Sequence, residues 1–131
     1  MQDHYFYDYS IIRVVPKVER EEFLNVGVIV FCHEKDFLDA EFFVDENKLK
    51  IFDASINISI VKKHLTAIAD ICSGKNDSSE IRNLSKREKF HWLTSPKSTI
   101  IQTSSVHSGY NKNPKEVLKH LVDTMVKAKN P

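Results

Sequence analysis

Apolar and aromatic residues come in three short runs in the first third of the chain, each bounded by charged or turn-forming residues. The first runs from Tyr5 to Val15 and ends at Pro16, the second covers Phe23 to Phe31, and the third covers Phe37 to Val44. β-branched and aromatic residues favour strands, and proline ends a strand because it has no N–H for the ladder. The short polar turn "HEKD" separates the second run from the third. The pattern therefore predicts a three-stranded antiparallel meander.

The spacing of apolar residues changes to a helical period after the third run. From Ile58 to Cys72 they recur at steps of three and four, between a cap at Ser55 or Asn57 and a stop at Gly74. This spacing predicts a helix that packs on the sheet.

Three more elements are predicted in the second half of the chain. "SKRE", which begins at Ser85, has the capping-box pattern and predicts a short helix through Leu93. A fourth strand is expected around Thr99 to Ser104, and Asn113 caps a last helix. The apolar face of that helix is expected to consist of Val117, Leu118, Leu121, Val122 and Met125.

The order β-β-β-α-α-β-α predicts an α+β fold in a single domain of residues 1–131. We expect an antiparallel sheet of about four strands with helices packed on one face. Trp92 is expected in the core, where it would anchor the short helix that contains it. The loop from Ser95 to Gly109 is expected to be ordered near the end of the first strand, with a tight turn of positive φ at Gly109.

An amide and a glycine interrupt the second apolar run, "EFLNVGVIVF", at Asn25 and Gly27. Alternation along strands puts both on one sheet face, which pairing extends to Tyr9, Arg13 and Glu41. One interpretation is structural: Gly27 marks a β-bulge, and Arg13 and Glu41 form a cross-strand ion pair. The other is that these five residues form a binding surface, because guanidinium, amide, carboxylate and phenol groups around a hollow can orient a partner.

The net charge limits the classes of partner that we expect, and the cysteines indicate the cellular compartment. Nineteen Lys and Arg against eighteen Asp and Glu give a formal charge of +1, which argues against nucleic acid as a partner. No apolar run approaches the roughly 20 residues that a membrane-crossing helix needs, so we expect no membrane association. Cys32 and Cys72 have no CxxC spacing, which predicts free thiols in a reducing cytoplasm.

Motifs of catalysis are missing from the sequence. There is no GxSxG elbow and no glycine-rich phosphate loop, and adjacent ligands in "FCHEK" would point to opposite faces of a strand. We therefore expect no catalytic residue, no metal and no cofactor.

The densest reactive group consists of Arg87, Lys97 and His107, set among several hydroxyls. These three residues are a candidate anion site, and they would serve the alternative function, a nucleic-acid-associated or phosphate-handling enzyme. The competing interpretation is that the hydroxyls satisfy turn backbone while Arg87 is solvated.

Two long segments and the capped last helix resemble a bacterial family known as domain of unknown function 3037 (DUF3037). The segments are "YSIIRVVPKVEREEFLNVGVIVFC" and "SKREKFHWLTSPKSTIIQTSSVHSG". The matching residues include Arg13, Pro16, Glu19, Arg20, Glu22, Asn25, Gly27, Arg87, Phe90, Trp92, Leu93, Pro96, Ser98, Gln102, His107 and Gly109.

Genes of this family often lie beside a Hip-type kinase-like gene, so the resemblance implies an accessory or regulatory role next to such a kinase. We therefore expect a non-enzymatic, cytoplasmic protein-interaction or regulatory domain. The sequence leaves open the identity of the partner and the oligomeric state.

Overall fold

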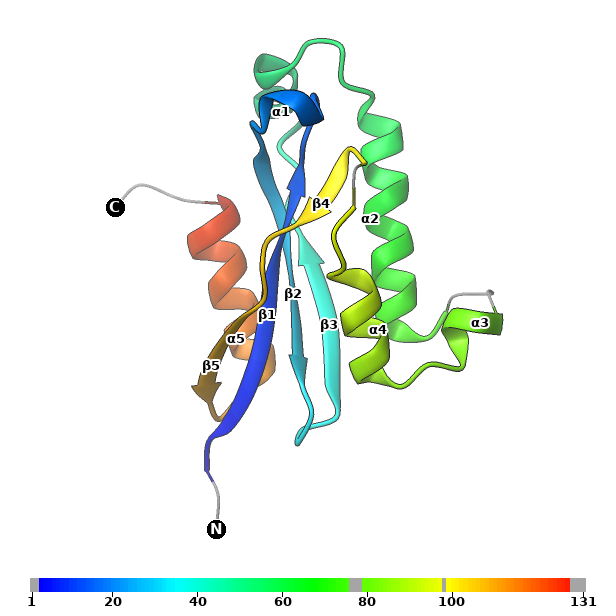
Figure 1. Ribbon diagram of the computed structural model, residues 1–131. Helices are drawn as coiled ribbons and strands as arrows, with labels where there is room; N and C mark the ends of the chain where they lie inside the picture. The colour runs from blue at the N-terminus through cyan, green and yellow to red at the C-terminus, as the bar shows by residue number, and fades with distance from the viewer. Residues whose placement is uncertain (1–2, 76–78, 98, 128–131) are drawn as a thin grey trace.

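Five strands form one antiparallel sheet in the computed structural model, which describes residues 3–75, 79–97 and 99–127 (Figure 1). Their order is β3-β2-β1-β4, and β5 also pairs with β1. Ser98, which belongs to the second family segment, lies outside the described residues. The strands are β1 (Tyr5–Val14), β2 (Leu24–Cys32), β3 (Phe37–Phe42), β4 (Ile101–Thr103) and β5 (His107–Asn111). The predicted meander and fourth strand are confirmed.

Strands β4 and β5 lie one after the other along the same edge of β1. Between them, Ser104 holds the chain to β1: its N–H donates to Ile11 O at 2.8 Å, and its Oγ accepts from Ile11 N–H at 2.8 Å. The buried Ser10 hydroxyl also donates to Ser104 O at 2.6 Å. The segment expected near the end of the first strand therefore pairs along most of it.

The sequence pattern did not indicate β5, and the turn expected at Gly109 is absent. Gly109 lies within β5 opposite Tyr7, and Gly74 is the glycine with positive φ among the described residues. A Cβ on Gly109 would lie 2.2 Å from the Tyr7 hydroxyl oxygen. The absence of a side chain at Gly109 leaves room for the Tyr7 ring to lie across the strand.

The three helices that the sequence predicts begin at the capping residues that it indicates. Asn57 caps α2 with its side chain, Gly74 ends it with φ 81°, and Ser85 and Glu88 form the capping box of α4. A further helix that the pattern missed, α1, follows β3. The helices are α1 (Glu46–Phe52), α2 (Ile58–Ser73), α3 (Ser79–Arg82), α4 (Lys86–Leu93) and α5 (Pro114–Leu121), with a 3₁₀ turn η1 (Val18–Arg20) and a π-helical end η2 (Val122–Lys127).

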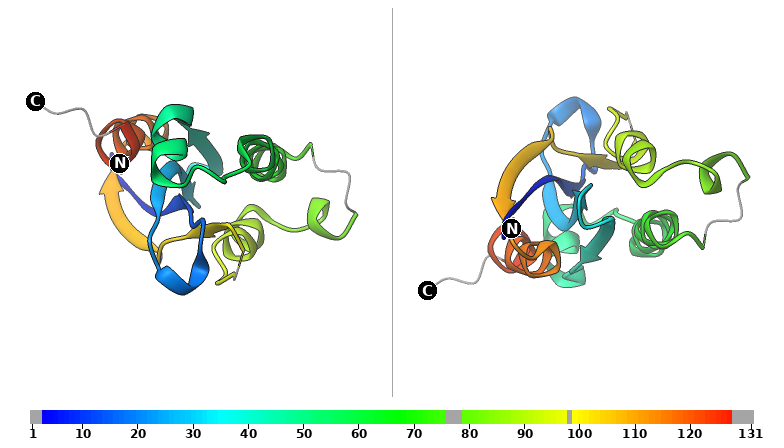
Figure 2. Two further views of the ribbon diagram at one scale, coloured as in Figure 1. Left: turned by 90° about the horizontal axis from the view of Figure 1, so that it is seen from above. Right: turned by 90° about the horizontal axis from the view of Figure 1, so that it is seen from below.

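Two hydrophobic clusters lie on opposite faces of the sheet. One packs α1, α2 and α4 against residues such as Ile12 and Ile29, and the other packs α5 and η2 against Ile11, Val28 and Val30. Figure 2 shows α5 on one side of the sheet and α2 and α4 on the other. The α+β class is confirmed, but the expectation that helices pack on one face is corrected: they cover both faces, because β2 is apolar on both.

Two expected core residues are exposed instead. Trp92 is 44% exposed. The side of α4 that faces the core is the one with Phe90 and Leu93, which are 1% and 5% exposed. Met125 is also exposed, and Val126 is buried in its place. The wider turn of the π-helical segment shifts the inward position by one residue.

Candidate interaction surface

A β-bulge in β2 decides which side chains share a face with Arg13. Ile12 pairs with Gly27 and Arg13 pairs with Asn25, so Val26 is an extra residue on β2. The extra residue reverses the alternation. Asn25 therefore lies on the α5 face, where its Nδ2 donates to Met125 O at 3.0 Å.

Gly27 faces the opposite way, toward the α2 and α4 side of the sheet. It pairs with Phe42, which packs against the cluster on that side, and a Cβ on Gly27 would lie 2.6 Å from Phe42 Cδ1. The Glu41 carbonyl oxygen would lie 2.9 Å from the same Cβ. Gly27 is thus part of the packed interior beside the bulge, and its expected place on the binding surface is corrected.

Arg13 and Asn25 form a cross-strand pair on the α5 face. The Arg13 guanidinium carbon lies 3.9 Å from the centroid of the Phe23 ring, which is half-exposed. Arg13 Nε and Asn25 Oδ1 are both buried, and neither has a hydrogen-bond partner within the described chain. A donor and an acceptor are therefore left unpaired on neighbouring strands.

Exposed apolar side chains surround this pair. Phe43 and Met125 are each about as exposed as Phe23, and Lys127 Nζ lies 5.4 Å from the centroid of the Phe43 ring. Asn25, Phe43 and Lys127 also line a hollow of about 40 Å³, which is too small for an ordinary ligand. We name this surface the Arg13 patch; it consists of Arg13, Phe23, Asn25, Phe43, Met125 and Lys127.

The other two residues expected on the binding surface share its face but lie outside the patch. Tyr9 packs against the cluster under α5 and contacts His107, with 5.4 Å between the ring centroids. Glu41 is exposed on β3, opposite Val28. The described residues contain a bulge but no Arg13–Glu41 ion pair, so the structural interpretation holds in its first half.

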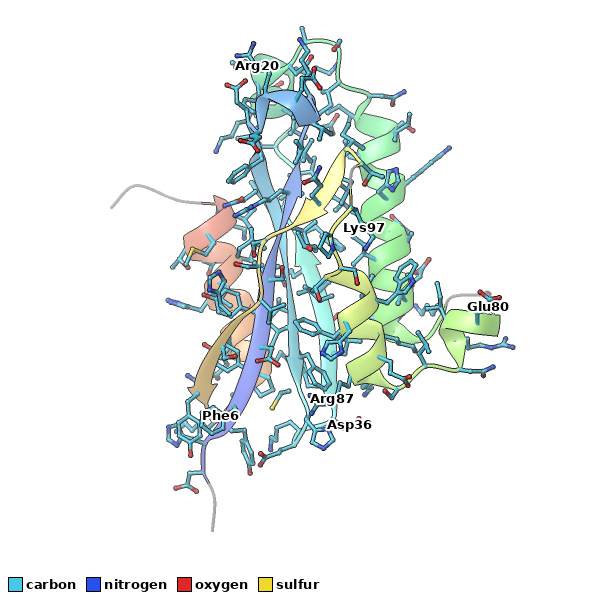
Figure 3. The ribbon with its side chains drawn as sticks, in the orientation of Figure 1. Phe6, Arg20, Asp36, Glu80, Arg87 and Lys97 are labelled. Carbon is cyan, nitrogen blue, oxygen red and sulfur yellow. The ribbon has the colours of Figure 1, made fainter. Side chains whose placement is uncertain are left out.

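The structure does not bring together Arg87, Lys97 and His107. Arg87, on α4, lies with its guanidinium carbon 5.2 Å from the Phe31 ring centroid, on the α2 and α4 side of the sheet. His107 is on β5 beside Tyr9, which belongs to the other face. Figure 3 shows Arg87 close to the β2–β3 turn and Lys97 well above it.

Lys97 is also occupied. Its ammonium donates to the carbonyl oxygens of Trp92 at 3.0 Å and Ser95 at 3.3 Å, at the C-terminal end of α4. Burial lowers the pKa of Lys97 from its ordinary value. Carbonyls at a helix end are a usual partner for a lysine, so this cation stabilises α4 and the three residues form no common anion site.

The two thiols are buried and unpaired with each other. Burial, and after it the charge of Asp39, raises the pKa of Cys72 to about 12. Within the described residues, no group of three His, Cys, Asp or Glu side chains is placed to hold a metal ion. The described helices also include none with the length and apolar character needed to cross a membrane.

We predict that Cys72 resists alkylation in the native protein. At pH 8 the thiol is almost entirely protonated, and the thiolate is the reactive form. Mass spectrometry after brief iodoacetamide treatment should find Cys72 unmodified, and prior unfolding in urea should make it react. Rapid labelling of the native protein would contradict the buried placement.

Four members of the patch were absent from the predicted surface: Phe23, Phe43, Met125 and Lys127. Phe23 and Phe43 read as ends of apolar strands, and Met125 as a core position of the last helix. In the structure Phe23 and Phe43 each lie just beyond a strand end, which the apolar pattern does not show, because it includes both residues in the predicted strands.

The chain belongs to the family described as Protein of unknown function (DUF3037), whose model matches residues 9–126. The match includes β1 from Tyr9 onward and extends through η2 as far as Val126, so it contains Arg13, Asn25 and Met125. No curated protein and no solved structure matches the chain.

Proposed function

We propose that this DUF3037 chain is a non-catalytic protein-interaction or regulatory domain that binds its partner through the Arg13 patch. The observation that carries the proposal is the buried, unpaired Arg13 Nε beside the unpaired Asn25 Oδ1. An unsatisfied buried polar group costs about 1–3 kcal/mol, which is recovered when a partner supplies the missing bond.

The composition of the patch suits a protein partner. Arginine and aromatic residues are enriched where binding energy concentrates, and the three apolar side chains Phe23, Phe43 and Met125 would lose water together. Because the chain itself covers both atoms, the two side chains must turn outward before a peptide carbonyl can accept from Arg13 and a peptide N–H can donate to Asn25.

The first partner to test is a Hip-type kinase-like protein, which the family resemblance implies. We propose a bacterial, cytoplasmic setting, which suits a chain whose two cysteines remain free thiols. In this role the domain would position or restrain the kinase-like protein and would itself carry out no chemistry.

Arg13→Ala should weaken capture of the kinase-like partner by at least about tenfold, since a hot-spot arginine contributes roughly 2 kcal/mol or more. The variant should unfold at nearly the same temperature as the parent, because it removes a buried nitrogen that has no partner. Co-expression with a Hip-type kinase-like protein, followed by affinity capture and titration calorimetry, measures the effect.

Arg82→Ala is the matched control, because Arg82 is an exposed arginine on α3. It should bind like the parent. Capture that survives Arg13→Ala would remove the patch from the interface, and a large loss of thermal stability would assign Arg13 a structural role.

A further inference from the structure

The outer edge of β5 is an open strand edge. β5 pairs with β1 on one side, and no strand among residues 3–75, 79–97 and 99–127 pairs with its other side. Its sequence, "HSGYN", contains no proline and no Lys, Arg, Asp or Glu, which are the residues that usually block edge pairing. Backbone N–H and C=O groups are therefore available to an added strand.

The opposite edge of the sheet is protected in the way that β5 is not. β3 carries two exposed carboxylates, Asp39 and Glu41. Asp39 Oδ1 also accepts from the Ala40 N–H at 2.8 Å, so that backbone donor is already occupied. The contrast marks β5 as the edge left free to pair.

A cavity of about 260 Å³ lies between β5 and α5 on one side of this edge. Its apolar walls are Tyr7, Val117 and Leu121. Tyr7 can lie there because Gly109 has no side chain, and burial raises the pKa of Tyr7, so its phenol stays neutral. An added strand would direct alternate side chains toward this cavity.

One carboxylate, Glu116, stands at the cavity beside polar Asn111 and His120. Glu116 forms no ion pair in the described part of the chain, and its carboxylate makes no hydrogen bond there. The cavity lining contains no lysine or arginine. A cavity with apolar walls on one part and a carboxylate on another is complementary to a side chain with an apolar stem and a cationic head.

The other side of the β5 edge is aromatic. Phe6 is 68% exposed, and its ring lies with its centroid 4.7 Å from that of Tyr110. Phe6 stands at the free lower end of the sheet in Figure 3. This pair would pack against the side chains that an added strand presents on the face opposite the cavity.

We propose that the β5 edge binds an extended segment of a partner protein as an additional strand, with a lysine or arginine of that segment in the cavity and paired with Glu116. Main-chain hydrogen bonds to β5 supply the affinity, and the cavity selects the side chain. This site is separate from the Arg13 patch and does not depend on the function proposed for it.

A second copy of the chain fits the site poorly. Antiparallel pairing of two β5 strands would bring to the cavity side the residues of β5 that share the face of Tyr7, namely His107, Gly109 and Asn111. None of these is a lysine or arginine, so the cavity would stay unfilled and Glu116 unpaired. Charge complementarity therefore favours a basic segment from another protein.

The test uses three short labelled peptides rich in threonine and valine, with a central lysine, glutamate or norleucine, titrated against the full chain by fluorescence anisotropy. The lysine peptide should bind about fivefold more tightly than the glutamate peptide, because Glu116 is exposed and an exposed ion pair contributes up to about 1 kcal/mol. Amide NMR signals of His107 to Asn111 should shift on binding. Two further versions of the lysine peptide carry N-methyl groups on one or the other set of alternate residues. Only the version methylated on the edge that pairs with β5 should lose binding.

Glu116→Lys should invert the preference, so that the glutamate peptide binds more tightly, and Glu116→Gln should abolish the preference. Glu34→Gln, an exposed carboxylate in the β2–β3 turn, is the matched control and should bind like the parent. Thermal unfolding checks that each variant is folded, since Asn113 still caps α5.

Three results would overturn the proposal: equal affinities for the lysine and glutamate peptides, no binding of either, or binding without shifts in β5. Sedimentation of the protein alone tests whether a second copy occupies the edge. A dimer whose β5 amides are protected from exchange would assign this edge to a second copy and overturn the proposal. Arg13→Ala should leave peptide binding unchanged, so the two sites can fail independently.

Discussion

Replacing Phe90 by alanine should lower the free energy of unfolding by about 3–5 kcal/mol, the usual cost of truncating a buried phenylalanine. The ring is 1% exposed and stacks on Phe31, with 5.6 Å between centroids. It attaches α4 to β2, so its loss removes burial and leaves a cavity. Urea unfolding followed by far-ultraviolet circular dichroism measures the change.

Trp92→Ala is the control on the same helix. Trp92 is 44% exposed and contacts the Lys97 ammonium, whose Nζ lies 5.1 Å from the ring. The substitution should cost less than about 1 kcal/mol. In the parent, Trp92 emission should be red-shifted relative to a buried indole. If Trp92→Ala destabilises more than Phe90→Ala, the core-facing side of α4 has been assigned wrongly.

This comparison shows what the sequence could decide about α4. The capping box needs only Ser85 and Glu88 at the correct spacing, so the start of the helix is a local property. The buried face is not local. Phe90, Trp92 and Leu93 all lie within one turn, and the position of the sheet decides which of them points inward.

The candidate site likewise had features that the sequence could predict and features that depended on the fold. Alternation correctly placed Arg13 and Asn25 on one face with Tyr9, because directly paired residues on neighbouring strands point to the same face of the sheet. It misplaced Gly27 because one extra residue, Val26, reverses the alternation. Gly27 suggests a bulge, but the run "VGVIV" does not show which residue is the extra one, because every position looks suitable for burial.

Strand β5 could not be predicted for a related reason. "HSGYN" has neither apolar alternation nor high strand propensity, and it pairs because β1 extends past β4 and offers a free edge. The sequence also predicted the wrong buried residue after α5, Met125 in place of Val126, because a π-helical turn depends on how η2 packs. The starts of the apolar strands and of the three predicted helices could be predicted from the sequence, whereas α1, β5 and the buried face of each element depended on the fold.

The glycine that interrupts β2 gives the last prediction. Gly27→Val should lower the free energy of unfolding by at least about 2 kcal/mol, the scale of overpacking a well-packed interior. A Cβ there would lie 2.6 Å from Phe42 Cδ1 and 2.9 Å from Glu41 O, whereas carbon atoms pack at about 3.5–4.0 Å. Urea unfolding is the measurement.

Two further variants separate the causes. Adding Phe42→Ala to Gly27→Val should relieve the side-chain clash only, because the Glu41 oxygen belongs to the backbone and cannot rotate away. Gly109→Ala should cost less than Gly27→Val, since the nearest atoms there all belong to the half-buried Tyr7 side chain, which can swing outward. If Gly27→Val is as stable as the parent, Gly27 lies on an open face, and the alternation expected without a bulge would be restored.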